Sequence, residues 1–119
     1  MSKGERTPGP RIEVLQGTLD LMVLQVLESM GPQHGYGIAR RIEQISGDVL
    51  KLNEGTVYTA LMRLQHQRSI AASWGTSENN RKARFYAITA AGRRQLAREV
   101  KTWDSLAAVI ARLRGAESV

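Results

Sequence analysis

The side chains of this sequence best placed to do chemistry are basic, and they gather in one stretch. Residues 55–98 hold eight Lys and Arg against the single acid Glu78, a balance of +7, whereas nine bases and ten acids in the rest of the chain leave −1. Positive charge concentrated in this way predicts a polyanionic partner. The alternative is an ordinary solvated surface, which runs of charge often form.

Residues for metal or nucleophilic chemistry lack the necessary spacing. The chain has no Cys, and His34 and His66 stand apart without a zinc-binding pattern. Ser and Thr residues have no identifiable general base nearby, and no phosphate-loop glycine pattern is present. We therefore expect no enzyme activity, no metal and no cofactor.

The length of 119 residues suits one domain with an appended helix. No apolar run is long enough to span a membrane, and residues 1–11 lack the apolar region of a secretory signal. The absence of Cys also fits a reducing compartment. We expect an intracellular, cytoplasmic protein that is not bound to a membrane.

Hydrophobic periodicity predicts three helices in the first half of the chain, at 18–30, 36–45 and 54–67. Thr18 is the expected cap of the first helix, which Gly31-Pro32 ends, and Asn53 caps the third. One face of the third helix is apolar. The opposite face is polar and basic, carries no acid, and could enter a DNA groove; it consists of Thr59, Met62, Arg63 and His66.

After residue 69 the period changes to two, which predicts two short strands at 70–74 and 83–88. The connection between them is polar, and its tip carries Asn79, Asn80, Arg81 and Lys82. Such a tip suits DNA phosphates or a minor groove, and taken alone it suits water equally well.

Thr89 is the expected cap of a last, long helix that reaches about residue 114. Its apolar residues follow a heptad-like seam made of Leu96, Val100, Trp103, Ala107 and Ile110. A second copy of the chain would bury this seam, and packing back onto the first helix is the alternative.

The order of elements is three helices, a hairpin and a helix. It predicts a mainly α fold with a small β-hairpin: a winged helix-turn-helix followed by a long C-terminal dimerisation helix. We divide the chain into a flexible basic tail (1–14), a DNA-binding domain (15–90) and a dimerisation helix (91–119). The basic residues of the tail could reach a phosphate backbone.

Four segments add a resemblance to a known family. Leu15-Gln-Gly-Thr-Leu19, Gly35-Tyr-Gly-Ile38, Gly55-Thr-Val-Tyr-Thr-Ala-Leu-Met-Arg-Leu64 and Arg84-Phe-Tyr-Ala-Ile-Thr-Ala-Ala-Gly92 resemble, in order and spacing, the PadR family of bacterial transcriptional regulators. Trp103 also matches a Trp frequent in that family's last helix. The chain departs from the pattern at Thr59, Gln65 and Arg68, where the family usually has Pro, Glu and Gly.

The resemblance implies a winged-helix repressor that dimerises through its last helices, binds a palindromic operator in double-stranded DNA, and in many members releases DNA when a small hydrophobic ligand binds. The DNA contacts that it implies on the third helix are Thr56, Tyr58, Thr59 and Arg63. Tyr36, Lys51 and the wing residues Asn80, Arg81 and Lys82 are further candidates.

Several of these assignments have alternatives. Arg63 could read guanine or only bind phosphate, and Tyr58 could instead be a half-buried core residue. Trp74 and Trp103 could contact a ligand, or serve strand packing and dimer anchoring. For the whole chain, the alternatives to a sequence-specific regulator are a winged-helix module that binds an acidic protein and a non-specific DNA-coating protein.

Overall fold

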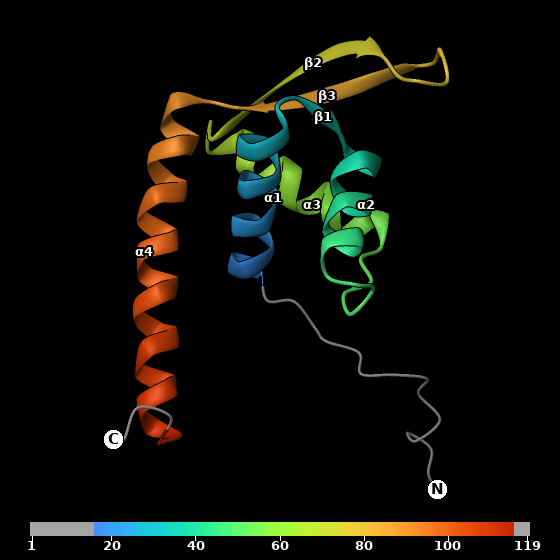
Figure 1. The fold of residues 1–119 in the computed structure, drawn as a ribbon. Helices are drawn as coiled ribbons and strands as arrows, with labels where there is room; N and C mark the ends of the chain where they lie inside the picture. Colours follow the sequence, from blue (N-terminus) through green and yellow to red (C-terminus); the bar gives the residue numbers. More distant parts are fainter. Residues whose placement is uncertain (1–15, 116–119) are drawn as a thin grey trace, which may run out of the picture.

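The computed structural model describes residues 16–115, so the predicted tail (1–14) lies outside the described residues. The elements, drawn in Figure 1, are α1 (Gln16–Met30), β1 (Gln33–His34), α2 (Gly35–Ile45), α3 (Glu54–His66), β2 (Ile70–Thr76), β3 (Lys82–Ile88) and α4 (Ala90–Leu113). None of the helices within 16–115 is long and apolar enough to cross a membrane.

Helix α1 is the centre of the core, because it packs against α2, α3, α4 and β3. Its side chains Val23, Leu24 and Leu27 are almost completely buried. The helix begins at Gln16, so the expectation that Thr18 caps it is wrong. It ends as predicted, since Gly31 adopts the left-handed conformation (φ +82°) that a residue without a Cβ reaches easily.

The sheet has three antiparallel strands in the order β1-β3-β2, one more than the predicted hairpin. β1 is only two residues long, and Gln33 and His34 pair with Tyr86 and Phe85 of β3. A strand of two residues has no alternation that could reveal it in a sequence. The hairpin keeps the predicted two-residue period, and its buried residues Ile70, Tyr86 and Ile88 belong to the core.

The caps predicted for the last two helices are confirmed. The Asn53 side chain accepts a hydrogen bond from the Thr56 N–H (2.7 Å), and the Thr89 hydroxyl accepts one from the Gly92 N–H (3.0 Å). The same Thr89 hydroxyl donates to the carbonyls of Arg68 and Ser69, so the start of α4 is tied to the chain that leaves α3.

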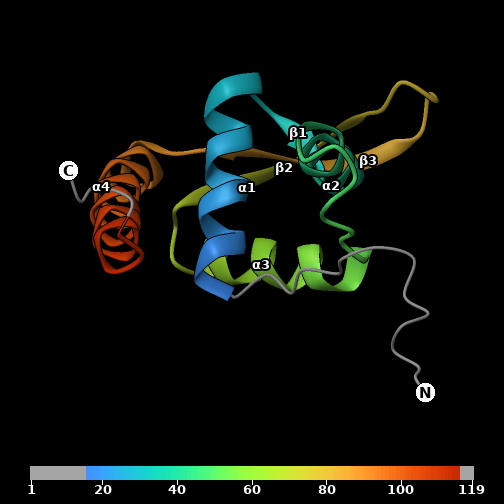
Figure 2. The same ribbon diagram turned by 60° about the horizontal axis from the view of Figure 1, so that its bottom comes forward.

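Helix α4 lies beside α1 and then extends well beyond it (Figure 1). Its first turns belong to the core through the buried Leu96 and the partly buried Val100. Helix α3 lies below the sheet in Figure 2 and crosses the start of α1. Two helices with exposed faces therefore flank one compact core.

Candidate nucleic-acid interface

Helix α3 is fixed on one side and open on the other. Val57, Ala60, Leu61 and Leu64 are buried, as the periodicity predicts. The opposite side exposes three side chains with hydroxyl groups, Thr56, Tyr58 and Thr59, together with the apolar Met62. We call these four residues the α3 face. Their size and chemistry suit the edges of base pairs in a major groove.

Within the α3 face, the Thr59 hydroxyl donates to the Gly55 carbonyl at 2.9 Å. Its oxygen can still accept a hydrogen bond from a base amino group, because a hydroxyl has two acceptor positions. A hollow of about 280 Å³ lies beside this residue and is lined by Gln16, Leu19, Thr56, Thr59 and Arg63. The start of α1 therefore borders the α3 face.

Arg63, the expected basic contact of this helix, is engaged inside the protein. Its Nε and Nη2 donate to the two carboxylate oxygens of Asp20 at 3.1 and 2.6 Å. The hydrogen bond to Asp20, supported by the attraction between the charges, raises the pKa of the Arg63 guanidinium above its usual value. Asp20 is itself buried on α1. The role of Arg63 in DNA binding stays a prediction, and its first role is to hold α3 on α1.

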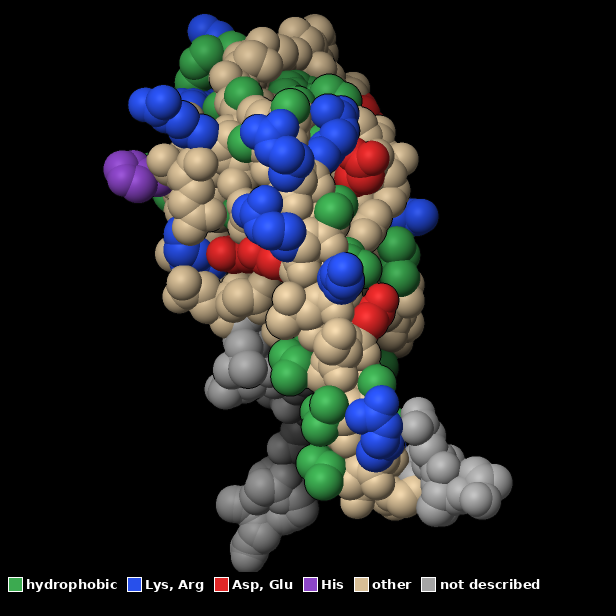
Figure 3. Space-filling model, turned by 90° about the vertical axis from the view of Figure 1, so that its left-hand side faces the viewer, with side chains coloured by type: hydrophobic (Ala, Val, Ile, Leu, Met, Phe, Trp, Pro, Cys, Tyr) green, Lys and Arg blue, Asp and Glu red, His purple; other side chains and the backbone are tan. Residues whose placement is uncertain are grey.

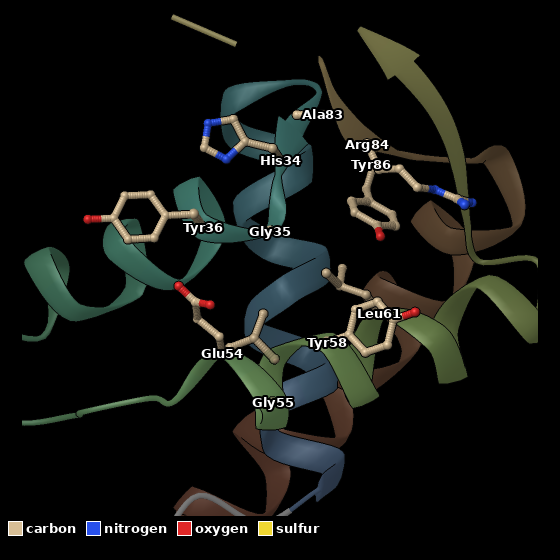
Figure 4. Close-up of a pocket in the computed structure, with 11 residues that line it drawn as sticks. His34, Gly35, Tyr36, Glu54, Gly55, Tyr58, Leu61, Ala83, Arg84 and Tyr86 are labelled. Carbon is tan, nitrogen blue, oxygen red and sulfur yellow. The ribbon is translucent and has the colours of Figure 1, made fainter. Parts of the chain in front are cut away.

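Tyr58 and Tyr36 are exposed by 57% and 58%, so Tyr58 is not the half-buried core residue of the alternative interpretation. Both rings line a hollow of about 570 Å³ between the starts of α2 and α3 and the strand β3 (Figure 4). Their hydroxyl groups are available to phosphates. The structure also places Glu54 and Arg84 at this hollow, and neither was among the predicted contacts.

The candidates Tyr36 on α2 and Lys51 in the connection to α3 are both exposed, and each has a neighbour within the chain. His34 caps α2 by accepting from the Gly37 N–H (3.0 Å), and its ring stacks on that of Tyr36, with centroids 6.3 Å apart. Lys51 lies in the connection to α3 and forms a solvent-exposed pair with Asp48 at 3.7 Å. An exposed pair of this kind contributes little to stability, so Lys51 can exchange Asp48 for a phosphate.

We call β2, β3 and their connection the wing. Two backbone hydrogen bonds order the turn at its tip: the Ser77 N–H donates to the Arg81 carbonyl, and the Asn80 N–H donates to the Ser77 carbonyl. Asn80 is left-handed with φ +60°. Lys82 is the first residue of β3 rather than a loop residue. The cations of Lys82 and Arg84 lie 5.3 and 5.5 Å from the ring centre of Trp74, which is 62% exposed. The ring thereby orders two cations on one face of the wing.

The basic stretch 55–98 is continuous in sequence but divided in space. Three of its cations lie on the wing and three on α4. β3 leads directly into α4, but the tip of the wing points away from α4 in both views (Figures 1 and 2). Figure 3 looks onto α4 and shows basic side chains over its upper part and hydrophobic ones along its projecting lower part. One α4 cation, Arg93, pairs with Glu28 at 2.9 Å. Arg84 of the wing lines the same hollow as Tyr58 of the α3 face.

The predicted seam on α4 is partly buried in the core and partly exposed. Leu96 is only 7% exposed and Val100 packs on the core, so this end of the seam is used within the chain. Trp103, Ala107 and Ile110 continue the same side of the helix and are exposed. Leu106, Val109 and Leu113 widen this exposed stripe. Trp74 lies on the half of β2 that extends away from α4, so the two Trp residues do not share one site within the chain.

Comparison with known proteins finds transcriptional regulators of similar fold. The model of the transcriptional regulator PadR-like family matches residues 23–98. A solved transcriptional regulator from Clostridium thermocellum is 26% identical, with a TM-score of 0.74 over 82% of this chain and 90% of that one. A PadR family transcription regulator from Clostridium difficile is 25% identical, with a TM-score of 0.70 over 80% and 96% of the two chains. An uncharacterised protein from Lysinibacillus sphaericus is 27% identical over 84% of this chain and 91% of its own length.

Proposed function

The chain belongs to the PadR-like family of transcriptional regulators, and from this premise we propose that it is a homodimeric repressor that reads a palindromic operator. Regulation of transcription through DNA binding is the activity of the family, and neither family nor fold is that of an enzyme. The proposal adds the symmetry of the complex, the residues that contact DNA, the sign of the regulation and its release by a small hydrophobic ligand.

The α3 face is the observation that carries this proposal. It presents Thr56, Tyr58, Thr59 and Met62 to solvent, while the buried side fixes the helix from behind and the Arg63–Asp20 pair fixes it at one edge. A rigid helix with hydrogen-bonding groups on its outer side can discriminate base pairs. A docking helix for a protein partner would instead present an apolar stripe.

The wing and the hollow beside α3 supply contacts that do not depend on sequence. The wing tip and β3 carry Asn80, Arg81, Lys82 and Arg84, all accessible to solvent. Tyr36 of α2 and Tyr58 of α3 line the hollow that these two helices share with β3 of the wing. In this arrangement α3 enters the major groove. The sugar-phosphate backbone of the DNA at the edge of that groove passes along the hollow lined by Tyr36 and Tyr58 towards the wing.

The exposed stripe on α4 supports the homodimer. It is continuous with the buried side of the same helix, and an apolar surface of this kind is normally covered. Packing the stripe on its own copy around a two-fold axis would place the two α3 helices symmetrically. The operator would then consist of two inverted half-sites about one helical turn of DNA apart, or a multiple of it.

Fluorescence anisotropy with duplex DNA tests the proposal. DNA from upstream of the protein's own gene is compared with a scrambled duplex at two salt concentrations, for the wild type and for Thr59→Ala. If the protein reads sequence, its affinity for the operator should exceed that for the scrambled duplex by roughly 10³-fold or more, and Thr59→Ala should reduce this ratio. Equal affinities that fall equally with salt would instead support non-specific coating. A promoter fused to a reporter gene then separates repression from activation.

A further inference from the structure

A third concave site lies between α1 and α2, and its lining contains no residue of α3 or of the wing. It is a groove of about 380 Å³. Its walls are formed by Met22, Val26 and Met30 of α1 and by Ile42 and Ile45 of α2. Met30 and Ile45 are exposed by 44% and 67%, so apolar surface continues to the mouth of the groove. Contiguous exposed apolar surface on a small domain is a mark of a binding site.

The lining selects a flexible aliphatic ligand. It contains no aromatic side chain, and two thioethers face branched aliphatic side chains across it. Planar ring systems are usually held by stacking on aromatic residues, whereas Met side chains adapt their shape to an irregular chain. The hollow between α2, α3 and β3 differs in this respect, because the aromatic rings of Tyr36 and Tyr58 line it. The groove therefore suits an acyl chain better than a flat aromatic compound.

The polar groups at the groove leave one strong partner for a ligand. The Ser29 hydroxyl already exchanges hydrogen bonds with Gln25, and the Ser46 hydroxyl donates to the Glu43 carbonyl and accepts from the Leu50 N–H. Arg41 also lines the groove, and its guanidinium has no hydrogen bond or ion pair with any residue of 16–115. An unpaired guanidinium beside an apolar groove is suited to a carboxylate, which it can bind through two parallel hydrogen bonds.

We propose that this groove binds a fatty-acid-like carboxylate, with the acyl chain between α1 and α2 and the carboxylate on Arg41. The ligand would act on DNA binding through the two helices that it contacts. α1 holds α3 through Asp20, and α2 carries Tyr36, so a chain wedged between them changes the position of Tyr36 relative to α3. This regulatory consequence rests on the proposed function, whereas binding of the ligand does not.

Isothermal titration of the full chain with decanoate, below its micelle concentration, tests the site directly. We expect saturable binding at one decanoate per chain. Each methylene removed should weaken binding about fourfold, so hexanoate should bind roughly 200-fold more weakly. Arg41→Gln should lower the affinity for decanoate at least about tenfold. The matched control is Arg40→Gln, which removes the neighbouring exposed cation that does not line the groove and should leave the affinity unchanged.

A second variant and two further probes keep the proposal falsifiable. Ile45→Glu alters an exposed residue, so the fold should persist while the added carboxylate repels the ligand. Equal binding of 1-decanol, equal binding by Arg41→Gln, or no heat with decanoate would overturn the carboxylate site. Preference for 2-naphthoate would overturn the acyl-chain assignment. Dissociation of a dimer by Ile45→Glu in sedimentation experiments would make the groove a contact between copies instead.

Anisotropy on DNA separates this inference from the proposed function. Decanoate should weaken operator binding by the wild type and not by Arg41→Gln. If titration finds the site while no DNA sequence is preferred, the ligand site stands and the proposed function fails. If operator binding is specific but decanoate does not bind, the groove has been wrongly assigned and the proposed function is unaffected.

Discussion

Arg63 of α3 and Asp20 of α1 form a two-point ion pair that joins the helix with the exposed polar face to the central helix of the core. The two hydrogen bonds measure 2.6 and 3.1 Å, and the Asp20 side chain has almost no contact with solvent. A planar guanidinium that binds both oxygens of a carboxylate fixes orientation as well as distance. The direction in which α3 presents Thr56 and Thr59 is therefore set by this pair, which lies beside them at the edge of the α3 face.

Removal of one partner of this pair is expected to destabilise the fold. Arg63→Ala leaves the buried Asp20 carboxylate unpaired and should cost about 3 kcal/mol in urea unfolding. The double variant Asp20→Leu/Arg63→Met replaces both charges by apolar groups and should recover most of that loss. A double variant as unstable as Arg63→Ala would contradict this account. Weak DNA binding by Arg63→Ala alone is consequently no proof of a base contact.

The pair was absent from the sequence-based prediction because 43 residues separate its members. Periodicity placed Arg63 correctly on the polar side of α3, but it cannot show that a buried carboxylate on another helix reaches it. The same holds for Leu96, whose heptad spacing matches a dimer seam although the core of the same chain already covers it. Local signals predict the caps Asn53 and Thr89, which act on N–H groups three residues away. They fail at Thr18, which lies inside α1.

Gly92 is a position where α4 touches the backbone of the segment after α3. A Cβ atom there would lie 2.0 Å from the Ser69 carbonyl oxygen and 2.8 Å from Ile88. Gly92→Ala should therefore cost about 3 kcal/mol, since backbone cannot move aside as a side chain can. The matched control is Gly17→Ala at the exposed start of α1, with no atom within 4 Å, which should be neutral or stabilising by up to about 1 kcal/mol. Equal thermal unfolding of the two variants would refute the contact.

Arg68 ends α3 in a left-handed conformation with φ +64°, at a position where Gly is easiest. Arg68→Gly should raise the free energy of unfolding by about 0.5–1 kcal/mol, because the strain of a side chain in this region is removed. Arg68→Ala removes the same charge and keeps the Cβ, so it should give no such gain. Chemical denaturation of both variants makes the comparison, and a gain shared by Ala would assign the effect to charge.

Ile110 tests the exposed stripe on α4. Ile110→Glu should produce monomers in sedimentation equilibrium without a large change in helix content, since the side chain is 55% exposed in the single chain. Lys101→Glu places the same carboxylate on the opposite side of α4, at an exposed residue, and should leave the dimer intact. If both variants sediment like the wild type, the stripe is not the contact between copies.

Trp74 tests the wing. Trp74→Leu keeps an apolar side chain but removes the ring that orders Lys82 and Arg84. Affinity for operator and scrambled duplexes should fall together, by about two- to fivefold at low salt, because the ordered cations bind phosphate rather than base edges. Anisotropy titrations measure this effect. A loss confined to the operator would show that the wing reads sequence.

The central claim is that two symmetric copies of the α3 face read DNA sequence. Selection of bound duplexes from a random DNA library by the full-length wild-type protein, at physiological salt, tests this claim whichever gene is the target. The account predicts enrichment of an inverted repeat whose half-sites lie about 10 base pairs apart, centre to centre, or a multiple of that spacing. Enrichment of a single half-site would contradict the dimer, and a pool that stays random would contradict sequence reading itself.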